Sequence, residues 1–310
     1  MKKITVVTPC YNEEDNVEQI YSKVRDVFKQ IEGVKYEHLF IDNASTDRSV
    51  DILREIAASD QSVKLIINAR NFGHIRSPHY GLLQADGDAV ILMVADFQDP
   101  PTLIPTLIEK WIATDADAVL GVKSKSLESP VMFLIRSLYY SLINKLSETK
   151  LLKNFMGFGL YDRRLIDALR RIDEPYPYFR GLIFELTDRV EVIEYTQAAR
   201  KRGITKNNFY TLYDLALLGI CSHSKVPLRI ATWLGFTCSI LSVLTAVFYG
   251  VYKLFFWESF AIGVAPLVIG MFFFSAVQLF FIGVIGEYLG SIHTKVSNRP
   301  LVVERERVNF

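Results

Sequence analysis

The sequence lacks an excess of charge of either sign and contains few cysteines. Its 310 residues include 35 lysines and arginines against 34 aspartates and glutamates, a formal net charge of +1. This balance excludes the general basic field that bulk binding of nucleic acid needs. The three cysteines lie far apart without C-x-x-C spacing, which favours a reducing compartment over a disulfide framework. P-loop, G-x-G-x-x-G, H-E-x-x-H and G-x-S-x-G motifs are also absent, so the enzyme classes that they mark are not indicated.

Charged residues are missing from two long stretches near the C-terminus. Neither Ile230 to Tyr252 nor Ser259 to Gly286 contains an Asp, Glu, Lys or Arg. Each stretch has at least the roughly 20 residues that a helix needs to cross the hydrocarbon of a bilayer. The link from Lys253 to Glu258 is short, so the two predicted helices form a hairpin whose ends lie on one side. These features exclude a purely cytosolic protein and indicate an integral membrane protein.

Basic residues are concentrated on both sides of the predicted hairpin. Those before it are Arg200, Lys201, Arg202, Lys206, Lys225 and Arg229, and those after it are Lys295, Arg299, Arg305 and Arg307. The positive-inside rule therefore predicts that the large domain and both termini are cytoplasmic, as in a bacterial-type inner membrane. The expected parts are a cytoplasmic domain (1–228), a transmembrane hairpin (229–288, helices about 230–252 and 259–286) and a cytoplasmic tail (289–310).

The first 228 residues alternate between strand and helix patterns. Strands are predicted at residues 4–8, 38–41, 63–67, 89–94 and 118–122, where β-branched and apolar residues form short runs. Helical patterns between these runs predict βαβ units, and hence an α/β fold with a mostly parallel sheet. Ligands of such sheets bind beyond the carboxyl ends of the strands. This rule marks Pro9–Glu13, Asp42–Asp47 and Asp96–Asp99 as candidate site segments.

Two further segments of this domain have one apolar face. They span about residues 129–148 and 208–220. Each fits two interpretations, which are packing in the core of the domain and an amphipathic helix that lies on the surface of the bilayer. The sequence leaves both interpretations open.

The end of the predicted strand at 89–94 carries side chains suited to a divalent metal. Asp96 supplies a carboxylate and Gln98 an amide oxygen, the hard ligands that Mg²⁺ and Mn²⁺ prefer. A metal held there would neutralise a diphosphate as it leaves in a group transfer. Tyr11 adds an aromatic face for a base, so the combination predicts a site for a nucleotide diphosphate. His74 and His79 have no third ligand nearby and are interpreted as loop or helix-surface residues.

These segments together resemble glycosyltransferase family 2. The matching segments are Val7–Glu14, Asp42–Asp47, Arg70–Gly73 and Ala95–Pro101. Two later features, Phe179–Leu182 and Arg200 with Lys206, narrow the resemblance to the polyprenyl-phosphate glycosyltransferases, which include dolichol-phosphate mannose synthase and bactoprenol glucosyltransferase. The resemblance implies a GT-A (Rossmann-like) fold, a Mg²⁺ or Mn²⁺ cofactor and a homo-oligomer. It also implies inverting transfer of a sugar from a nucleotide diphosphate to a polyprenyl phosphate at the cytoplasmic face of the membrane.

The resemblance also implies roles for individual residues. The nucleotide-sugar site would comprise Pro9, Tyr11, Glu13, Asp42, Asn71, Asp96 and Lys206, with Asp96 and Gln98 as metal ligands. The acceptor phosphate would be bound by Lys123, Lys125 and Arg136, since phosphates favour charge-assisted donors. The catalytic residues would be Asp96, Arg200 and Asp162.

The sequence departs from the family pattern at three positions. Val94 stands where the family has the first acid of its D-x-D motif, and Asn43 follows Asp42 where a second acid is common. Gly157 opens the segment in which the family often has an Asp, so Asp162 is the nearest remaining carboxylate. A phosphate acceptor is already anionic near neutral pH, because the second pKa of a monoester is about 6. The departures therefore affect donor choice and metal geometry more than the type of reaction.

Three functions are compared on these observations. The first is transfer of a hexose to undecaprenyl phosphate or a similar lipid, with UDP-glucose favoured and GDP-mannose or UDP-N-acetylglucosamine as alternative donors. The second, a processive polysaccharide synthase, would carry a Gln-x-x-Arg-Trp motif, but none of Trp111, Trp233 and Trp257 follows an Arg. The third is a catalytically inactive, membrane-anchored binding protein, suggested by Val94 and Gly157. The motif residues that are retained favour the enzyme.

Overall fold

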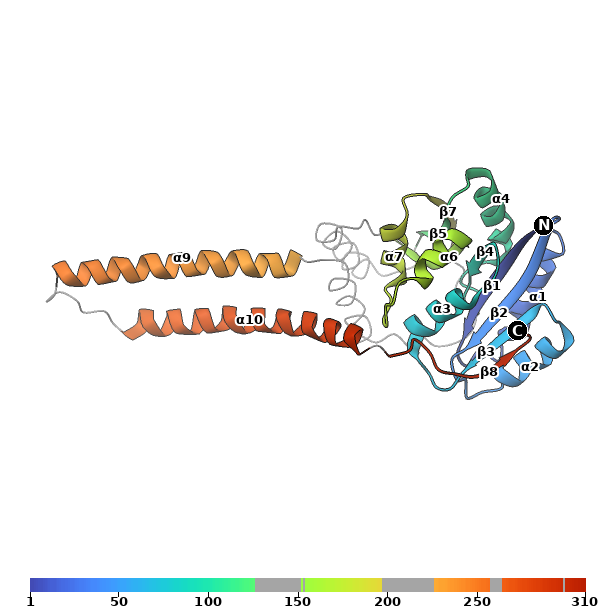
Figure 1. Cartoon of the computed structure of the whole chain (residues 1–310), viewed down its shortest axis with the longest axis horizontal. Helices are drawn as coiled ribbons and strands as arrows, with labels where there is room; N and C mark the ends of the chain where they lie inside the picture. The colour runs from blue at the N-terminus through green and yellow to red at the C-terminus, as the bar shows by residue number, and fades with distance from the viewer. Residues whose placement is uncertain (126–151, 153, 197–225, 257–263, 298) are drawn as a thin grey trace.

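Eight strands form one sheet in the order β7-β5-β6-β4-β1-β2-β3-β8. The computed structural model describes residues 1–125, 152, 154–196, 226–256, 264–297 and 299–310 (Figure 1). The strands are β1 (Lys2–Cys10), β2 (Val34–Asp42), β3 (Val63–Asn68), β4 (Ala89–Leu92), β5 (Ala118–Lys125), β6 (Phe155–Asp162), β7 (Val190–Thr196) and β8 (Glu304–Val308). All five strands predicted from the sequence are present.

The first four strands are parallel, and their order reverses beside β1. β1 pairs with β2 on one side and with β4 on the other, while β3 lies beyond β2. The chain therefore crosses back from β3 to β4, which creates a crevice between the carboxyl ends of β1 and β4. Val7 is paired with Leu92, and the Met93 amide still donates to the Val7 carbonyl at 3.0 Å. The residues that follow both strands consequently enter the same crevice.

Helices cover both faces of the sheet. One layer contains α1 (Val17–Phe28), α2 (Ser49–Ser59) and α4 (Ile104–Thr114), and the other contains α3 (Gly73–Gln84), α6 (Arg163–Arg170) and α7 (Phe179–Leu186). Successive side chains of a strand point to opposite faces. Val6 and Phe40 accordingly pack in the α1–α2–α4 core, whereas Val7 and Leu39 pack in the α3–α6–α7 core.

The second half of the sheet is mixed, which the sequence patterns did not predict. β6 lies between β4 and β5 and runs antiparallel to both, and β7 pairs in parallel with β5. β4 ends at Leu92, two residues earlier than expected, and Val94 is 37% exposed at the edge of the crevice.

Two long helices, α9 (Val226–Phe255) and α10 (Val264–Val296), extend from the domain side by side (Figure 1). They are long and apolar enough to cross a membrane over Val226–Thr245 and Gly270–Val296. Large apolar side chains such as Trp233, Phe248 and Phe272 are exposed along them. The two predicted helices are confirmed as helices, although α10 continues well beyond Gly286.

After α10 the chain returns to the sheet. β8 pairs antiparallel with β3 and covers the edge that β3 would otherwise expose. Glu304 accepts a hydrogen bond from the Tyr80 hydroxyl at 2.8 Å, and Asn309 donates to the carbonyls of Ala57 (2.7 Å) and Val63 (2.8 Å). The predicted tail, residues 289–310, therefore contains the end of α10 and an edge strand of the domain.

The contact of Asn309 gives a test of this docking. Asn309→Ala is expected to lower the free energy of unfolding by about 2–4 kcal/mol, because two carbonyls lose a donor and φ at residue 309 is +63°. Asn309→Gly keeps the backbone freedom and should lose only the part due to hydrogen bonds. Denaturant unfolding of the detergent-solubilised protein measures both values. Wild-type stability in both variants would contradict the docking of β8.

His38 is fully buried in the sheet. Its ring lies in β2 with Nε2 2.9 Å from the Thr8 hydroxyl and Nδ1 2.8 Å from the Tyr36 hydroxyl. Burial lowers the pKa of His38 from 6.5 to about 3, because the charged imidazolium would lose its hydration. The folded protein therefore holds the neutral ring.

This depressed pKa predicts a pH dependence of stability. Because the unfolded chain binds the proton more readily, stability is complete above pH 6.5 and declines as the pH falls towards 3. The slope approaches about 1.4 kcal/mol per pH unit, so the wild type should lose about 2 kcal/mol more than His38→Gln between pH 7 and 5. Equal losses in the two proteins, measured by denaturant unfolding at both pH values, would refute the assignment.

Candidate active site

A polar cavity of about 430 Å³ opens at the carboxyl ends of β1 and β4. Pro9, Tyr11 and Glu13 line it from the end of β1 and the segment that follows, and Asp96 lines it from the segment after β4. Asn71 completes the group from the loop that precedes α3. The structure thus brings together five of the residues that the sequence assigned to the nucleotide-sugar site, at the position expected for a ligand of this sheet.

The loops after β1 and β2 brace each other beside this cavity. The Asn12 amide donates to Ser45 Oγ at 2.9 Å, and the Thr46 amide donates back to Asn12 Oδ1 at 2.8 Å. The Glu13 amide donates to Ser49 Oγ at 2.8 Å. Asn12 adopts a left-handed backbone (φ +56°), which asparagine tolerates better than most residues. The position of Glu13 therefore depends on the loop that follows β2.

Asp42 lies at the end of β2 and is fully buried. Its carboxylate accepts hydrogen bonds from the Ser45 amide at 2.9 Å and from Ser45 Oγ at 2.5 Å. Burial raises the pKa of Asp42, and these bonds oppose that rise. Asp42 is not among the residues that line the cavity, whereas its neighbour Asn43 is. Its predicted contact with the base remains a prediction.

Asn43 organises the loop that carries Asn71, a role that the sequence analysis missed. Its Nδ2 donates to Asn71 Oδ1 (2.9 Å) and to the Gly73 carbonyl (3.2 Å). Its Oδ1 accepts from Asn68 Nδ2 (3.0 Å) and from the Phe72 amide (2.8 Å). A carboxylate could accept the second pair of bonds but could not donate the first pair. The departure from the acidic pair at this position therefore has a structural cause.

Asn43→Asp tests this role. The carboxylate would face two oxygen acceptors in a buried position, so binding of the nucleotide is expected to weaken at least tenfold and the melting temperature to fall. Gln61→Glu, the same change of an amide to a carboxylate at an exposed position between α2 and β3, serves as the matched control. Calorimetric titration with UDP, together with thermal unfolding, provides the measurement. Wild-type affinity in Asn43→Asp would show that the donated bonds are dispensable.

The segment from Asp96 to Asp99 turns sharply behind the cavity. Phe97 is buried with a left-handed backbone (φ +60°), and the Gln98 amide donates to Asp96 Oδ1 at 3.1 Å. Asp99 is buried against the Tyr195 hydroxyl, which donates to it at 2.7 Å. Burial raises the pKa of Asp99 to about 6, while the Tyr195 bond and the charge of Lys123 act in the opposite direction. The turn therefore fixes the direction of Asp96.

Asp96 fits a divalent cation that is shared with a substrate. Within the described residues there is no cluster of three or more His, Cys, Asp or Glu that could enclose a metal. Mg²⁺ is commonly held by one or two carboxylates together with phosphate oxygens and water, so a single cavity carboxylate is sufficient. Gln98 is half-buried and is not among the residues that line the cavity. Its predicted role as a metal ligand remains a prediction.

Asp162 lies outside the site, contrary to its predicted catalytic role. It pairs with Ala89 at the start of β4, whereas the cavity opens beyond the other end of that strand. Its carboxylate caps α6 through the Arg164 amide (2.8 Å) and accepts from Trp111 Nε1 (2.8 Å). These contacts give Asp162 a structural role at the N-terminus of α6. The predicted catalytic role is wrong, because Asp162 lies at the opposite end of β4 from the cavity.

The basic residues predicted to bind phosphate are not among the described residues that line the polar cavity. Lys123 lies on β5 close enough to Asp99 for its charge to lower that residue's pKa, and Lys125 is the last residue of β5. Neither lines the polar cavity. Arg136, Arg200 and Lys206 lie outside the described residues, as do the two predicted amphipathic segments.

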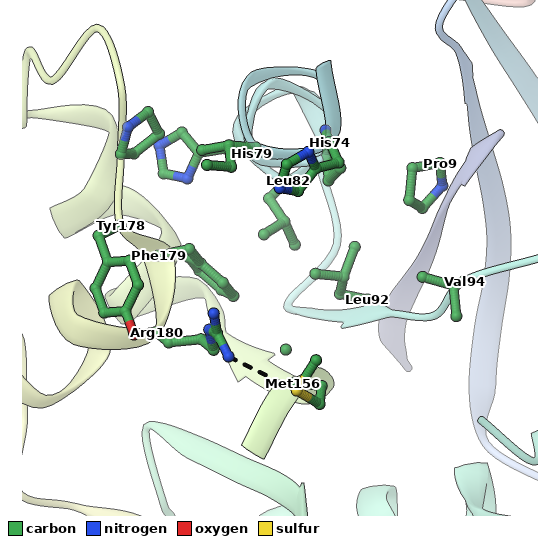
Figure 2. Close-up of a pocket in the computed structure, with 14 residues that line it drawn as sticks. Pro9, His74, His79, Leu82, Leu92, Val94, Met156, Tyr178, Phe179 and Arg180 are labelled. Atoms are coloured by element: carbon green, nitrogen blue, oxygen red, sulfur yellow. Dashed lines mark hydrogen bonds between the residues drawn. The ribbon is translucent and has the colours of Figure 1, made fainter. Parts of the chain in front are cut away.

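A second cavity, of about 220 Å³, adjoins the first (Figure 2). The two share Pro9, His74, Pro78 and Val94. Gly157 lines the second cavity, and its φ of +105° is a backbone conformation that residues other than glycine rarely adopt. The departure at Gly157 therefore also has a structural cause.

The two histidines of α3 line this second cavity. His79 is only 4% exposed, and burial lowers its pKa to about 4, so the ring is neutral near pH 7. Burial and the positive charge of Arg180 lower the pKa of His74. The interpretation of His79 as a loop or helix-surface residue is therefore wrong. Its ring is buried and packs against the ring of Phe179 at the start of α7.

The chain is similar in sequence to known glycosyltransferases. Residues 5–170 match the family described as Glycosyl transferase family 2. The SfII prophage-derived bactoprenol glucosyl transferase of Shigella flexneri is 36% identical over 299 residues, 96% of either chain. The prophage bactoprenol glucosyl transferase homolog of Escherichia coli strain K12 is 33% identical over 299 residues, 96% of this chain and 97% of the relative.

A solved structure of similar shape supports the same fold. It is glucosyl-3-phosphoglycerate synthase from Mycobacterium tuberculosis in complex with Mn²⁺, UDP and phosphoglyceric acid. The TM-score is 0.50 at 18% sequence identity, with 71% of this chain and 76% of that chain covered. The α/β domain has the GT-A fold, as the motifs of the sequence implied.

Proposed function

Because the chain belongs to glycosyltransferase family 2, we propose that it is a hexosyltransferase that uses a polyprenyl phosphate as its acceptor. The favoured donor is UDP-glucose, and the product is a sugar linked through phosphate to the lipid. The observation that carries this proposal is the polar cavity that Asp96 lines together with Tyr11, Glu13 and Asn71. Relatives named bactoprenol glucosyl transferase, which match nearly the whole chain, support the choice of acceptor and sugar.

The residues of the polar cavity divide between the two ends of a nucleotide sugar. Tyr11 offers a ring for the base, while Glu13, Asn71 and the nearby Asp42 offer acceptors for N–H and hydroxyl groups. Asp96 would hold the Mg²⁺ or Mn²⁺ with the diphosphate. When bound, this metal supplies positive charge to the leaving diphosphate. Arg200 and Lys206 are proposed to add charge-assisted donors to the same phosphates.

The proposed reaction is a single displacement at the anomeric carbon. An oxygen of the acceptor phosphate forms a bond to this carbon, while the bond from the carbon to the diphosphate oxygen breaks. The nucleoside diphosphate leaves with that electron pair, and the configuration inverts. The acceptor needs no general base, since its phosphate is ionised at neutral pH. The presence of Gly157 rather than a carboxylate is compatible with this chemistry.

The apolar helices suit a lipid acceptor. α9 leaves the domain and α10 leads back to it, because β8 joins the same sheet. If the two helices cross a membrane, the domain and the C-terminal strand lie on the same side, and the flanking basic residues indicate the cytoplasm. We therefore propose an integral protein of a bacterial-type inner membrane with both termini cytoplasmic. The homo-oligomer implied by the family remains a prediction.

A donor panel tests the proposed function. The full chain in vesicles with undecaprenyl phosphate and Mg²⁺ or Mn²⁺ would receive labelled UDP-glucose, GDP-mannose or UDP-N-acetylglucosamine. A lipid-linked product is expected with UDP-glucose, and chelation of the metal should abolish it. A product formed only with another donor would correct the identity of the transferred sugar. The absence of product with every donor would refute the enzymatic function and favour a binding protein.

Asp96→Asn is expected to lower kcat by at least about 100-fold, because the carboxylate that would bind the metal loses its charge. Asp26→Asn is the matched control, since Asp26 lies exposed on α1, where it forms an ion pair with Lys29. Both variants would be assayed in the same vesicles, with thermal unfolding as a check of the fold. Full activity of Asp96→Asn would refute the metal assignment.

A further inference from the structure

We propose that the second cavity receives the phosphate end of the lipid acceptor, with Arg180 as the residue that binds the phosphate and the apolar wall as the site of the first isoprenoid unit. This inference rests on the proposed function and assigns a substrate to a cavity for which the sequence predicted none. It gives Arg180 the role that the sequence analysis gave to Lys123, Lys125 and Arg136.

The position of the cavity suits the acceptor of this reaction. Pro9 and Val94 belong to both cavities, so a molecule in the second cavity lies next to the cavity that contains Asp96. Figure 2 shows Arg180 on the side opposite Pro9 and Val94. A phosphate bound between the guanidinium and this junction would therefore face the polar cavity, in which the proposed function puts the donor.

The chemistry of the walls distinguishes a lipid from a sugar. The polar cavity is lined by Glu13, Asn43, Asn71 and Asp96, which can pair with hydroxyl groups. The second cavity is instead lined largely by aliphatic and aromatic side chains, among them Leu82, Leu92, Val94, Met156 and Phe179. A sugar placed there would leave most of its hydroxyl groups without partners, whereas an isoprenoid unit would gain from burial.

Arg180 supplies the charge that a phosphate needs. Its Nη1 makes only long contacts, 3.4 Å to the Phe155 carbonyl and 3.6 Å to Met156 Sδ, and its guanidinium lies 5.3 Å from the centre of the Tyr178 ring. Among the described residues it makes no ion pair with a carboxylate. Of the described residues in the wall of this cavity, it is also the only lysine, arginine or carboxylate residue. Most of its five N–H donors are thus available to an anion.

The cavity also lies on the membrane side of the domain. α3 and α7, which contribute to its walls, lie at the end of the domain that faces α9 and α10 (Figure 1). Lys295 at the end of α10 forms an ion pair of 2.8 Å with Glu174, in the loop that leads to Arg180. Arg76 of α3 donates to the carbonyl of Pro300, just after α10. Both walls are therefore tied to the segment that leaves the apolar helices.

Kinetics of Arg180→Gln in vesicles test the proposal. The KM for the polyprenyl phosphate is expected to rise at least tenfold, while the KM for the sugar nucleotide and the affinity for UDP stay within twofold. Arg180→Lys keeps the charge without the bidentate geometry and should recover part of the loss. Arg171→Gln is the matched control, because Arg171 is exposed beyond α6 and lines neither cavity.

A second variant tests the apolar wall separately. Met156→Gln keeps the length of the side chain and should raise the KM for polyprenyl phosphate about threefold or more, again without an effect on UDP binding. An unchanged acceptor KM in Arg180→Gln, or a rise in the donor KM instead, would overturn the proposal while the enzyme remains active. Failure of the wild type with every donor would instead refute the proposed function itself. UDP binding by each variant shows that the fold is retained.

Discussion

The parallel pairing of β1 with both β2 and β4 is the constraint on which the candidate site depends. Since the strands run in one direction and the order reverses at β1, the segments after Cys10 and Leu92 must leave the sheet at the same edge. Tyr11, Glu13 and Asp96 therefore line one cavity, although they follow different strands. A register shift of one residue in β4 would turn its side chains to the opposite face and separate this group.

The two adjoining cavities differ in polarity, as do the two proposed substrates, a sugar nucleotide and a lipid phosphate. Polar side chains surround the place proposed for the nucleotide, while apolar ones surround the place proposed for the lipid. Val94 belongs to both walls, and at this position the family pattern has an acid. An uncharged residue here adds no negative charge where the proposed donor diphosphate and acceptor phosphate would meet.

Much of the first half of the fold could be predicted, because its strands are buried on both faces and read as short apolar runs. Four of the five site residues that share the cavity lie in segments that were predictable because parallel strands place their carboxyl ends together, whereas Asn71 was indicated only by the family resemblance. β6 and β8 could not be found in this way, since the glycines of one and the alternating charges of the other resemble loops. Asp162 was misplaced because sequence distance does not show that β6 runs antiparallel to β4. The role of Asn43 depends on a contact with Asn71, 28 residues away, which no local pattern reveals.

The return of the chain as β8 bears on how the domain could reach the proposed lipid acceptor. A phosphate attached to a membrane lipid stays near one depth of the bilayer surface, so an enzyme that uses it must hold its cavity at that depth. A flexible linker would let the domain move away from the surface. Here Lys295 at the end of α10 pairs with Glu174 in the loop before α7, and the segment after α10 contacts α3 through Arg76 and joins the sheet through β8. These contacts fix the second cavity relative to the end of α10. If α10 crosses a membrane as proposed, its depth in the bilayer would therefore set the position of Arg180.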